Sequence, residues 1–71
     1  MPKLKWTDSE ELALRLLEKM PEQDPLAVRF TDLRDWVCQL EDFGDDPQLC
    51  NEAKLEAIQM AWLEERQEAG G

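Results

Sequence analysis

Residues 7–21 read TDSEELALRLLEKMP, and this stretch indicates the fold class because it contains a helix start, a helical face and a helix stop. Thr7 is followed three places later by Glu10, which is the spacing of a capping box, so a helix should begin at Asp8. Apolar side chains then recur at helical spacing and line one face. Pro21 should end the helix. The apolar positions are Leu12, Ala13, Leu16, Leu17 and Met20.

Two more helical segments follow. Asp24-Pro25 combines an N-cap residue with a proline at the first helical position, which predicts one turn or a short helix. Thr31 can cap a longer helix, whose first turn holds Asp32 in a favourable place against the helix dipole. The buried stripe predicted for this longer helix is Leu33, Trp36, Val37 and Leu40.

A last helix has two candidate starts, because Asp46-Pro47 and Asn51-Glu52 both fit the first residues of a helix. Leu55, Ile58 and Trp62 form one of its faces, while Met60 and Leu63 lie on the other side. A helix that is apolar on two sides is either sandwiched between elements of the domain or uses one side for docking.

The fold predicted from these segments is mainly α. Three principal helices with short connections favour a small three- to four-helix domain, orthogonal or winged-helix-like, over a coiled coil, since no heptad pattern persists. The three tryptophans and two phenylalanines are the expected core anchors. Residues 66–71 are polar and end in two glycines, so we expect a flexible tail there.

Size and charge restrict the function. The chain has 71 residues and a formal net charge of −9 (8 Lys and Arg against 17 Asp and Glu), with a pI near 4.3. A chain this short forms one domain and leaves little room for the water-excluding cleft of an enzyme. Its charge repels nucleic acid and anionic membranes, whose binding depends on cationic side chains. We therefore expect neither as a partner.

Missing residue types exclude further chemistry. The chain has no histidine, so Ser/His/Asp and Cys/His nucleophile systems cannot form within it. Its N-terminal residues lack the apolar run of a signal peptide, and no stretch is suited to span a membrane. Two cysteines in such a chain fit a reducing compartment. We expect a cytoplasmic protein.

Neither cysteine is placed like a nucleophile. Helical spacing puts Asp35 and Asp42 on the side of Cys38, and neighbouring carboxylates raise the pKa of a thiol. Cys50 lies near a helix start but also near three acidic residues in the sequence. A packing role is therefore favoured for Cys38, and neither cysteine is predicted to be catalytic.

The densest acidic segment lies between the second and the last long helix, where four carboxylates occupy the six positions 41–46. Clustered carboxylates suit Mg, Ca, Mn or ferrous iron, but no EF-hand spacing is present and no imidazole is available for a tight iron site. The same charge can form a solvated face or steer the chain toward a cationic partner. Steering requires that the surplus acids be concentrated on part of the surface.

The order of several short segments resembles the bacterial IscX family over residues 4–65. The resemblance runs through the chain with little or no gap. It is carried by Leu4-Lys5-Trp6-Thr7-Asp8-Ser9, Asp24-Pro25, Val28-Arg29-Phe30-Thr31-Asp32, Trp36-Val37-Cys38-Gln39-Leu40-Glu41-Asp42-Phe43, Asp45-Asp46-Pro47, Asn51-Glu52, Leu55-Glu56-Ala57-Ile58 and Trp62-Leu63.

The resemblance implies a modified winged-helix fold and an accessory role in iron-sulfur cluster assembly. It also implies binding to the cysteine desulfurase IscS and weak ferrous iron binding, with no tightly bound cofactor. Gly44 stands where some members carry an acid, and we expect no role for Pro2, Lys3 or the tail. The residues implied for both partner binding and weak iron binding are Asp32, Asp35, Glu41, Asp42, Asp45 and Asp46.

Residues and resemblance together predict a monomeric, non-catalytic acidic adaptor of the desulfurase. The alternative is an iron donor or sensor with a role like that of bacterial frataxin. A DNA-binding regulator, which a winged helix would otherwise suggest, is excluded by the charge.

Overall fold

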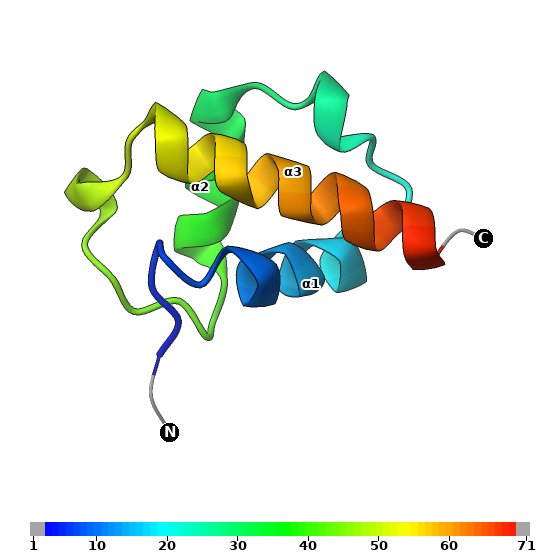
Figure 1. Cartoon of the computed structure of the whole chain (residues 1–71). Coiled ribbons are helices and arrows are strands. Elements are labelled where there is room, and N and C mark those ends of the chain that lie inside the picture. Colours follow the sequence, from blue (N-terminus) through cyan, green and yellow to red (C-terminus); the bar gives the residue numbers. More distant parts are fainter. Residues whose placement is uncertain (1–2, 70–71) are drawn as a thin grey trace.

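The computed structural model describes residues 3–69 and is mainly helical, as predicted (Figure 1). In this part of the chain three α-helices are joined by two short 3-10 turns, which confirms the predicted three- to four-helix domain. The only β-pairing in these residues is an isolated parallel bridge between Leu4 and Phe43, so the β-hairpin wing of a winged-helix domain is reduced to this one contact. The elements are α1 (Ser9–Lys19), η1 (Pro25–Ala27), α2 (Phe30–Gln39), η2 (Pro47–Leu49) and α3 (Glu52–Ala69).

The start of α1 lies where the sequence predicts it, but the capping box does not form. Asp8 is the residue before the helix, and no side chain caps the helix there. Its carboxylate accepts a hydrogen bond from the backbone N–H of Lys5 at 2.9 Å, so it closes the preceding turn instead. The helix ends at Lys19, before Pro21.

Helix α2 begins two residues earlier than predicted, at Phe30 with Arg29 as the preceding residue, instead of at Asp32 after a Thr31 cap. The N–H of Leu33 donates to the carbonyl of Arg29 at 2.9 Å, which closes the first turn at that point. Phe30 also packs against the core, and this contact holds it at the helix start. Core packing has therefore prevailed over the capping preference of Thr31.

Both predicted starts near the last helix are used. The Asp46 side chain caps η2 by accepting from the N–H of Gln48 at 2.9 Å, just as Asp24 caps η1. The Asn51 side chain then accepts from the N–H of Lys54 at 2.9 Å, at the first turn of α3. Two Asx caps in succession explain why two candidate starts are visible in the sequence.

The core lies between α1 and α3, which form the main packing pair, and α2 crosses behind α3 (Figure 1). Trp36 of the predicted stripe is only half-buried and contacts Trp62 edge to face, with ring centroids 6.4 Å apart. Trp6 and Trp62 are the two fully buried tryptophans. Both phenylalanines are half-buried. The buried apolar residues are Trp6, Leu12, Ala13, Leu16, Val28, Leu33, Val37, Leu40, Leu55, Ile58 and Trp62.

The C-terminal helix differs from the prediction at two points. Residues 66–69 of the predicted tail form the last turn of α3, and residues 70–71 lie outside the described part of the chain. Met60 is 52% exposed, so the side of α3 opposite the core is not sandwiched inside the domain. Within residues 3–69 no helix combines the length and apolar character needed to cross a bilayer.

Candidate functional site

The acidic segment between α2 and η2 is held in place by the N-terminal residues. The N–H of Leu4 donates to the carbonyl of Asp42 at 2.6 Å, and the N–H of Gly44 donates to the carbonyl of Leu4 at 2.9 Å. These bonds form the bridge between Leu4 and Phe43. The segment of residues 41–46, which we call the acidic loop, is therefore paired along one edge.

Trp6 joins the acidic loop to the core. Its ring is 1% exposed, and its Nε1–H donates to the carbonyl of Asp46 at 2.7 Å. The backbone N–H of Trp6 donates to a carboxylate oxygen of Asp45 at 3.2 Å. Phe43 packs on the Trp6 ring edge to face, with centroids 4.7 Å apart. A loop fixed by a buried aromatic ring has less freedom to lose when a partner binds.

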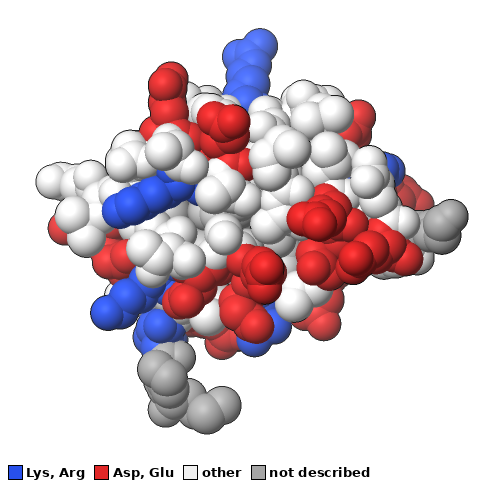
Figure 2. Space-filling view, in the orientation of Figure 1, with Lys and Arg blue, Asp and Glu red and all other residues white. Residues whose placement is uncertain are grey.

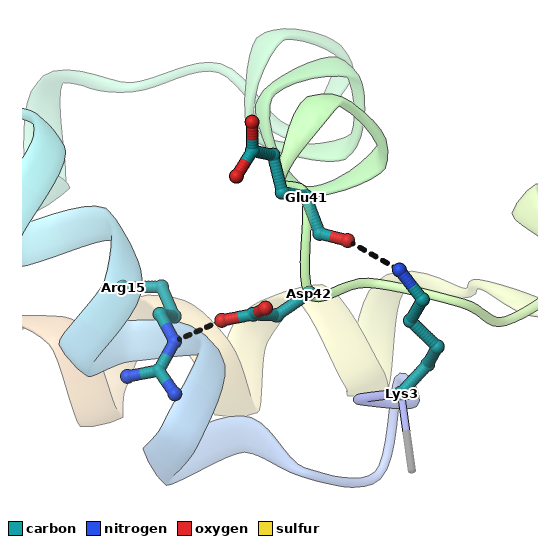
Figure 3. Close-up of polar contacts among 4 residues, drawn as sticks. All are labelled: Lys3, Arg15, Glu41 and Asp42. Carbon is teal, nitrogen blue, oxygen red and sulfur yellow. Dashed lines mark hydrogen bonds and ion pairs between the residues drawn. The ribbon is translucent and has the colours of Figure 1, made fainter. Parts of the chain in front are cut away.

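Lys3, for which no role is expected from the sequence, contacts the acidic loop. Its Nζ donates to the backbone carbonyl of Glu41 at 2.8 Å, as Figure 3 shows. A Cβ on Gly44 would lie 2.3 Å from the Cβ of Lys3, which is too close for two carbons. Glycine at position 44 therefore lets the N-terminal segment approach the acidic loop. Pro2 lies outside the described residues.

Asp42 is paired with a cation of helix α1. Its carboxylate lies 2.8 Å from Nε of Arg15, and the two side chains are 58% and 38% exposed (Figure 3). An ion pair this exposed contributes about 0–1 kcal/mol to stability. The pair nevertheless neutralises one of the six predicted site residues. Sequence reasoning missed it because the two residues are 27 positions apart.

Asp45 and Asp46 act as backbone acceptors. Asp45 accepts from the N–H of Asp46 at 2.8 Å as well as from that of Trp6. These two hydrogen bonds stabilise the ionised carboxylate and lower the pKa of Asp45 below its ordinary value of 3.8. Asp46 caps η2 through its bond to Gln48. Both carboxylates therefore shape the chain as well as carry charge.

The other three predicted site residues are Asp32, Asp35 and Glu41. All three side chains are exposed, and none forms an ion pair with another residue of the described part. Asp32 and Asp35 lie three positions apart on α2, so they share a helix face. Glu41 follows just after the helix end, at the start of the acidic loop. We call Asp32, Asp35 and Glu41 the outer acids.

The six predicted carboxylates do not fit a tight metal site. Among residues 3–69 no group of three or more His, Cys, Asp or Glu side chains is arranged to hold a metal ion. Asp42, Asp45 and Asp46 already use carboxylate oxygens in internal bonds. The structure thus divides the predicted set into three engaged carboxylates and the three outer acids.

Charged side chains are distributed over the face on which α3 lies. Figure 2 shows the acidic side chains of this face in several groups, with uncharged atoms and a few Lys and Arg side chains between them. Asp32 and Asp35 belong to α2, which lies behind α3 in this orientation. That the surplus acids are concentrated around the predicted site residues therefore stays a prediction.

The two cysteines are free, half-buried and packed against the core. Burial is the main cause that raises the pKa of the Cys38 thiol, Arg34 opposes it, and Cys50 and Asp35 add to it. The predicted direction of the pKa shift is confirmed, although burial outweighs Asp35, and Asp42, the other carboxylate predicted to act on Cys38, is not among the causes. A raised pKa leaves little thiolate at neutral pH.

Comparison with known proteins identifies a family and a close relative. Residues 4–67 match the model of a protein family described as iron-sulphur cluster assembly. The chain is also 59% identical over 63 residues to an uncharacterized protein of Pseudomonas aeruginosa. That alignment covers 89% of this chain and 96% of the relative.

Proposed function

The chain belongs to the iron-sulphur cluster assembly family, the IscX family that its sequence resembles, and on this premise we propose that it is a non-catalytic acidic adaptor that docks on the cysteine desulfurase IscS. Family membership supports an accessory role in cluster assembly. The observation that carries the docking proposal is the set of outer acids, which are exposed and free of ion pairs within the described residues.

The outer acids suit a cationic protein surface. With a net charge of −9, the chain is steered toward a basic partner, and the rate of encounter falls as salt screens the charges. Because helix α2 and the anchored acidic loop hold these carboxylates, little ordering is needed when they meet the partner. The proposed adaptor works in the cytoplasm, by changing how the desulfurase delivers sulfur.

Weak ferrous iron binding belongs to the same proposal. Carboxylate oxygens are hard ligands that hold such ions together with several waters. The outer acids keep their oxygens available, whereas the other three carboxylates are engaged. Iron would then be a cargo or a local effector held near the partner, bound without a preformed cage.

The docking proposal is tested by removing charge at the outer acids. Asp32→Asn, Asp35→Asn and Glu41→Gln combined should weaken binding to purified desulfurase about tenfold, as expected for three exposed pairs of about 0.5 kcal/mol each. The variant should also show a smaller loss of affinity as salt rises. Isothermal titration at several salt concentrations measures both effects.

The matched control removes the same charge elsewhere. Glu10→Gln, Glu18→Gln and Glu22→Gln combined changes three exposed acids on α1 and the turn that follows it. We expect this variant to bind within about twofold of the natural chain, a difference of about 0.4 kcal/mol. Equal weakening by the two variants would show that total charge, and not the outer acids, governs docking.

Titration with ferrous iron distinguishes the proposed adaptor from the alternative function, an iron donor or sensor. Anaerobic titration of the chain with ferrous iron should give weak, multiple binding that diminishes in the outer-acid variant. One defined site with a Kd below about 1 μM, which corresponds to about 8.2 kcal/mol, would favour the donor or sensor instead.

A further inference from the structure

The face of α3 that points to solvent carries exposed apolar side chains at helical spacing. Ala53, Ala57 and Met60 are exposed and share the side opposite the buried residues Leu55 and Ile58. Met60 keeps 52% of its surface accessible. Nothing in the described part of the chain covers this face, although a methionine in water is unfavourable compared with a buried one.

Two carboxylates that form no ion pair within the described residues lie on either side of Met60 along α3. Glu56 and Glu64 lie one helical turn before and after Met60, about 12 Å apart along the axis at 1.5 Å per residue. Both are exposed, and neither forms an ion pair with another residue between 3 and 69. The cations of α3 are directed elsewhere, since Lys54 donates to the carbonyl of Leu49 and Arg66 lines a groove beside α1.

A neighbouring turn places another exposed apolar residue beside the same helix. Gln59 of α3 donates through Nε2 to the carbonyl of Pro25 at 2.9 Å, which fixes η1 against α3. Leu26 in that turn is 61% exposed. Figure 2 views the molecule with α3 in front, and uncharged atoms separate the acidic groups there.

We propose that this face of α3 is a second protein-docking surface, which takes a basic protein surface with an apolar side chain between two cations about 12 Å apart. The apolar side chain would contact Met60, and the cations would pair with Glu56 and Glu64. A second copy of this chain would place like charges opposite one another, and an anionic membrane would be repelled. Charge complementarity therefore selects a cationic protein.

The proposed surface is separate from the outer acids. Asp32 and Asp35 are exposed residues of α2, which lies behind α3 in Figure 1, whereas Met60 is an exposed residue of α3 itself. The chain could then bind the desulfurase through one side and a second basic component through the other. This inference extends the proposed function, because the adaptor would then connect the desulfurase to a second protein. The test of the α3 surface does not require that the desulfurase binds.

The test uses the full chain, labelled with 15N, and a synthetic helical peptide as the probe. The peptide carries two lysines eight residues apart with a leucine midway. NMR shifts should concentrate at residues 53–64, and Met60→Gln should weaken binding about fivefold through the lost apolar contact. Leu49→Gln is the matched control, because Leu49 is 53% exposed but lies in η2, and it should leave the affinity unchanged.

Two results would overturn the proposal. The first is a set of shifts spread over all acidic residues with no effect of Met60→Gln, which would indicate attraction by net charge alone. The second is displacement of the peptide by saturating desulfurase, which would show that the two surfaces are not separate. Failure of the desulfurase to bind at all would count against the proposed adaptor and leave the peptide result standing in support of the α3 surface.

Discussion

Gly44 is the residue at which the N-terminal segment and the acidic loop come closest. Gly44→Ala would place its Cβ 2.3 Å from Cβ of Lys3 and 2.5 Å from Cγ, so one chain segment must move. We expect a loss of about 1–2 kcal/mol in the free energy of unfolding, typical of overpacking. Faster hydrogen exchange at the amides of Leu4 and Gly44 should accompany it, because their bridge would loosen.

A double variant checks the cause of that loss. Lys3→Gly together with Gly44→Ala removes the opposing Cβ and should recover stability relative to Gly44→Ala alone. If the double variant is as unstable as Gly44→Ala, the contact with Lys3 does not explain the requirement for glycine. Urea unfolding of the variants and the natural chain gives this comparison.

Asp45 should make part of the stability depend on acid pH. Its pKa is lowered in the folded chain, so its stabilising effect is fully present above the ordinary value of 3.8 and is lost as pH falls through the lower, folded-state pKa. We expect Asp45→Asn to flatten the fall of Tm below about pH 4. Asp35→Asn removes an equal charge without removing a backbone hydrogen bond and serves as the control.

A thermal melt series across this acid range measures the effect of Asp45. The variant should also be less stable at neutral pH, since an amide accepts the two backbone hydrogen bonds less well than a carboxylate. Identical acid-side slopes for the natural chain and Asp45→Asn would contradict the role assigned to the Trp6 and Asp46 hydrogen bonds.

At the scale of elements, Trp6 and Trp62 anchor different parts of the fold in comparable ways. Both rings are fully buried and make one edge-to-face aromatic contact. The ring nitrogen of Trp6 donates to the carbonyl of Asp46, whereas Nε1 of Trp62 has no hydrogen-bond partner among residues 3–69. The first therefore ties a loop to the core, and the second is held by packing alone.

This difference predicts unequal costs for the same substitution. Trp6→Phe loses a hydrogen bond and leaves the Asp46 carbonyl without it, so it should cost about 1 kcal/mol more than Trp62→Phe. Urea unfolding of the two variants supplies the two free energies. A larger cost for Trp62→Phe would mean that the hydrogen bond of Trp6 contributes little and that ring volume dominates.

The helices could be predicted from the sequence because each depends on local periodicity and caps. We could interpret the apolar helical face from Leu12 to Met20 and the cap at Asp24 from neighbouring residues alone, without knowing any distant contact. The start of α2 could not be placed, since the packing of Phe30 overrides the preference of Thr31, and packing is not visible in a local pattern.

The sequence identified which acidic residues make up the candidate site, but not how they are arranged or which contacts they make. The six acids could be named, yet the sequence did not show that half of them are engaged. The deciding partners are far away along the chain: Arg15 is 27 positions from Asp42, and Trp6 is 39 positions from Asp45. Contacts over such separations follow from the packing of α1 and the N-terminal segment, which no local pattern contains.

On the scale of the whole molecule, the net charge of −9 acts within a body only 34 × 26 × 16 Å. At about 0.01 M salt the Debye length is about 30 Å, so acids on all sides repel one another. The described residues contain a single ion pair to offset this. Self-repulsion should therefore destabilise the fold at low salt.

Sodium chloride should accordingly stabilise the free chain. Raising it from about 0.01 M to about 0.1 M shortens the Debye length to about 10 Å, and we expect the free energy of unfolding to rise by about 1 kcal/mol, or Tm by about 4–8 °C. The control variant with Glu10→Gln, Glu18→Gln and Glu22→Gln should show a smaller rise, because less repulsion remains to be screened. A Tm that falls with salt would mean that favourable pairs outweigh repulsion. The same salt must weaken docking through the outer acids, so stability and affinity should respond to salt with opposite signs.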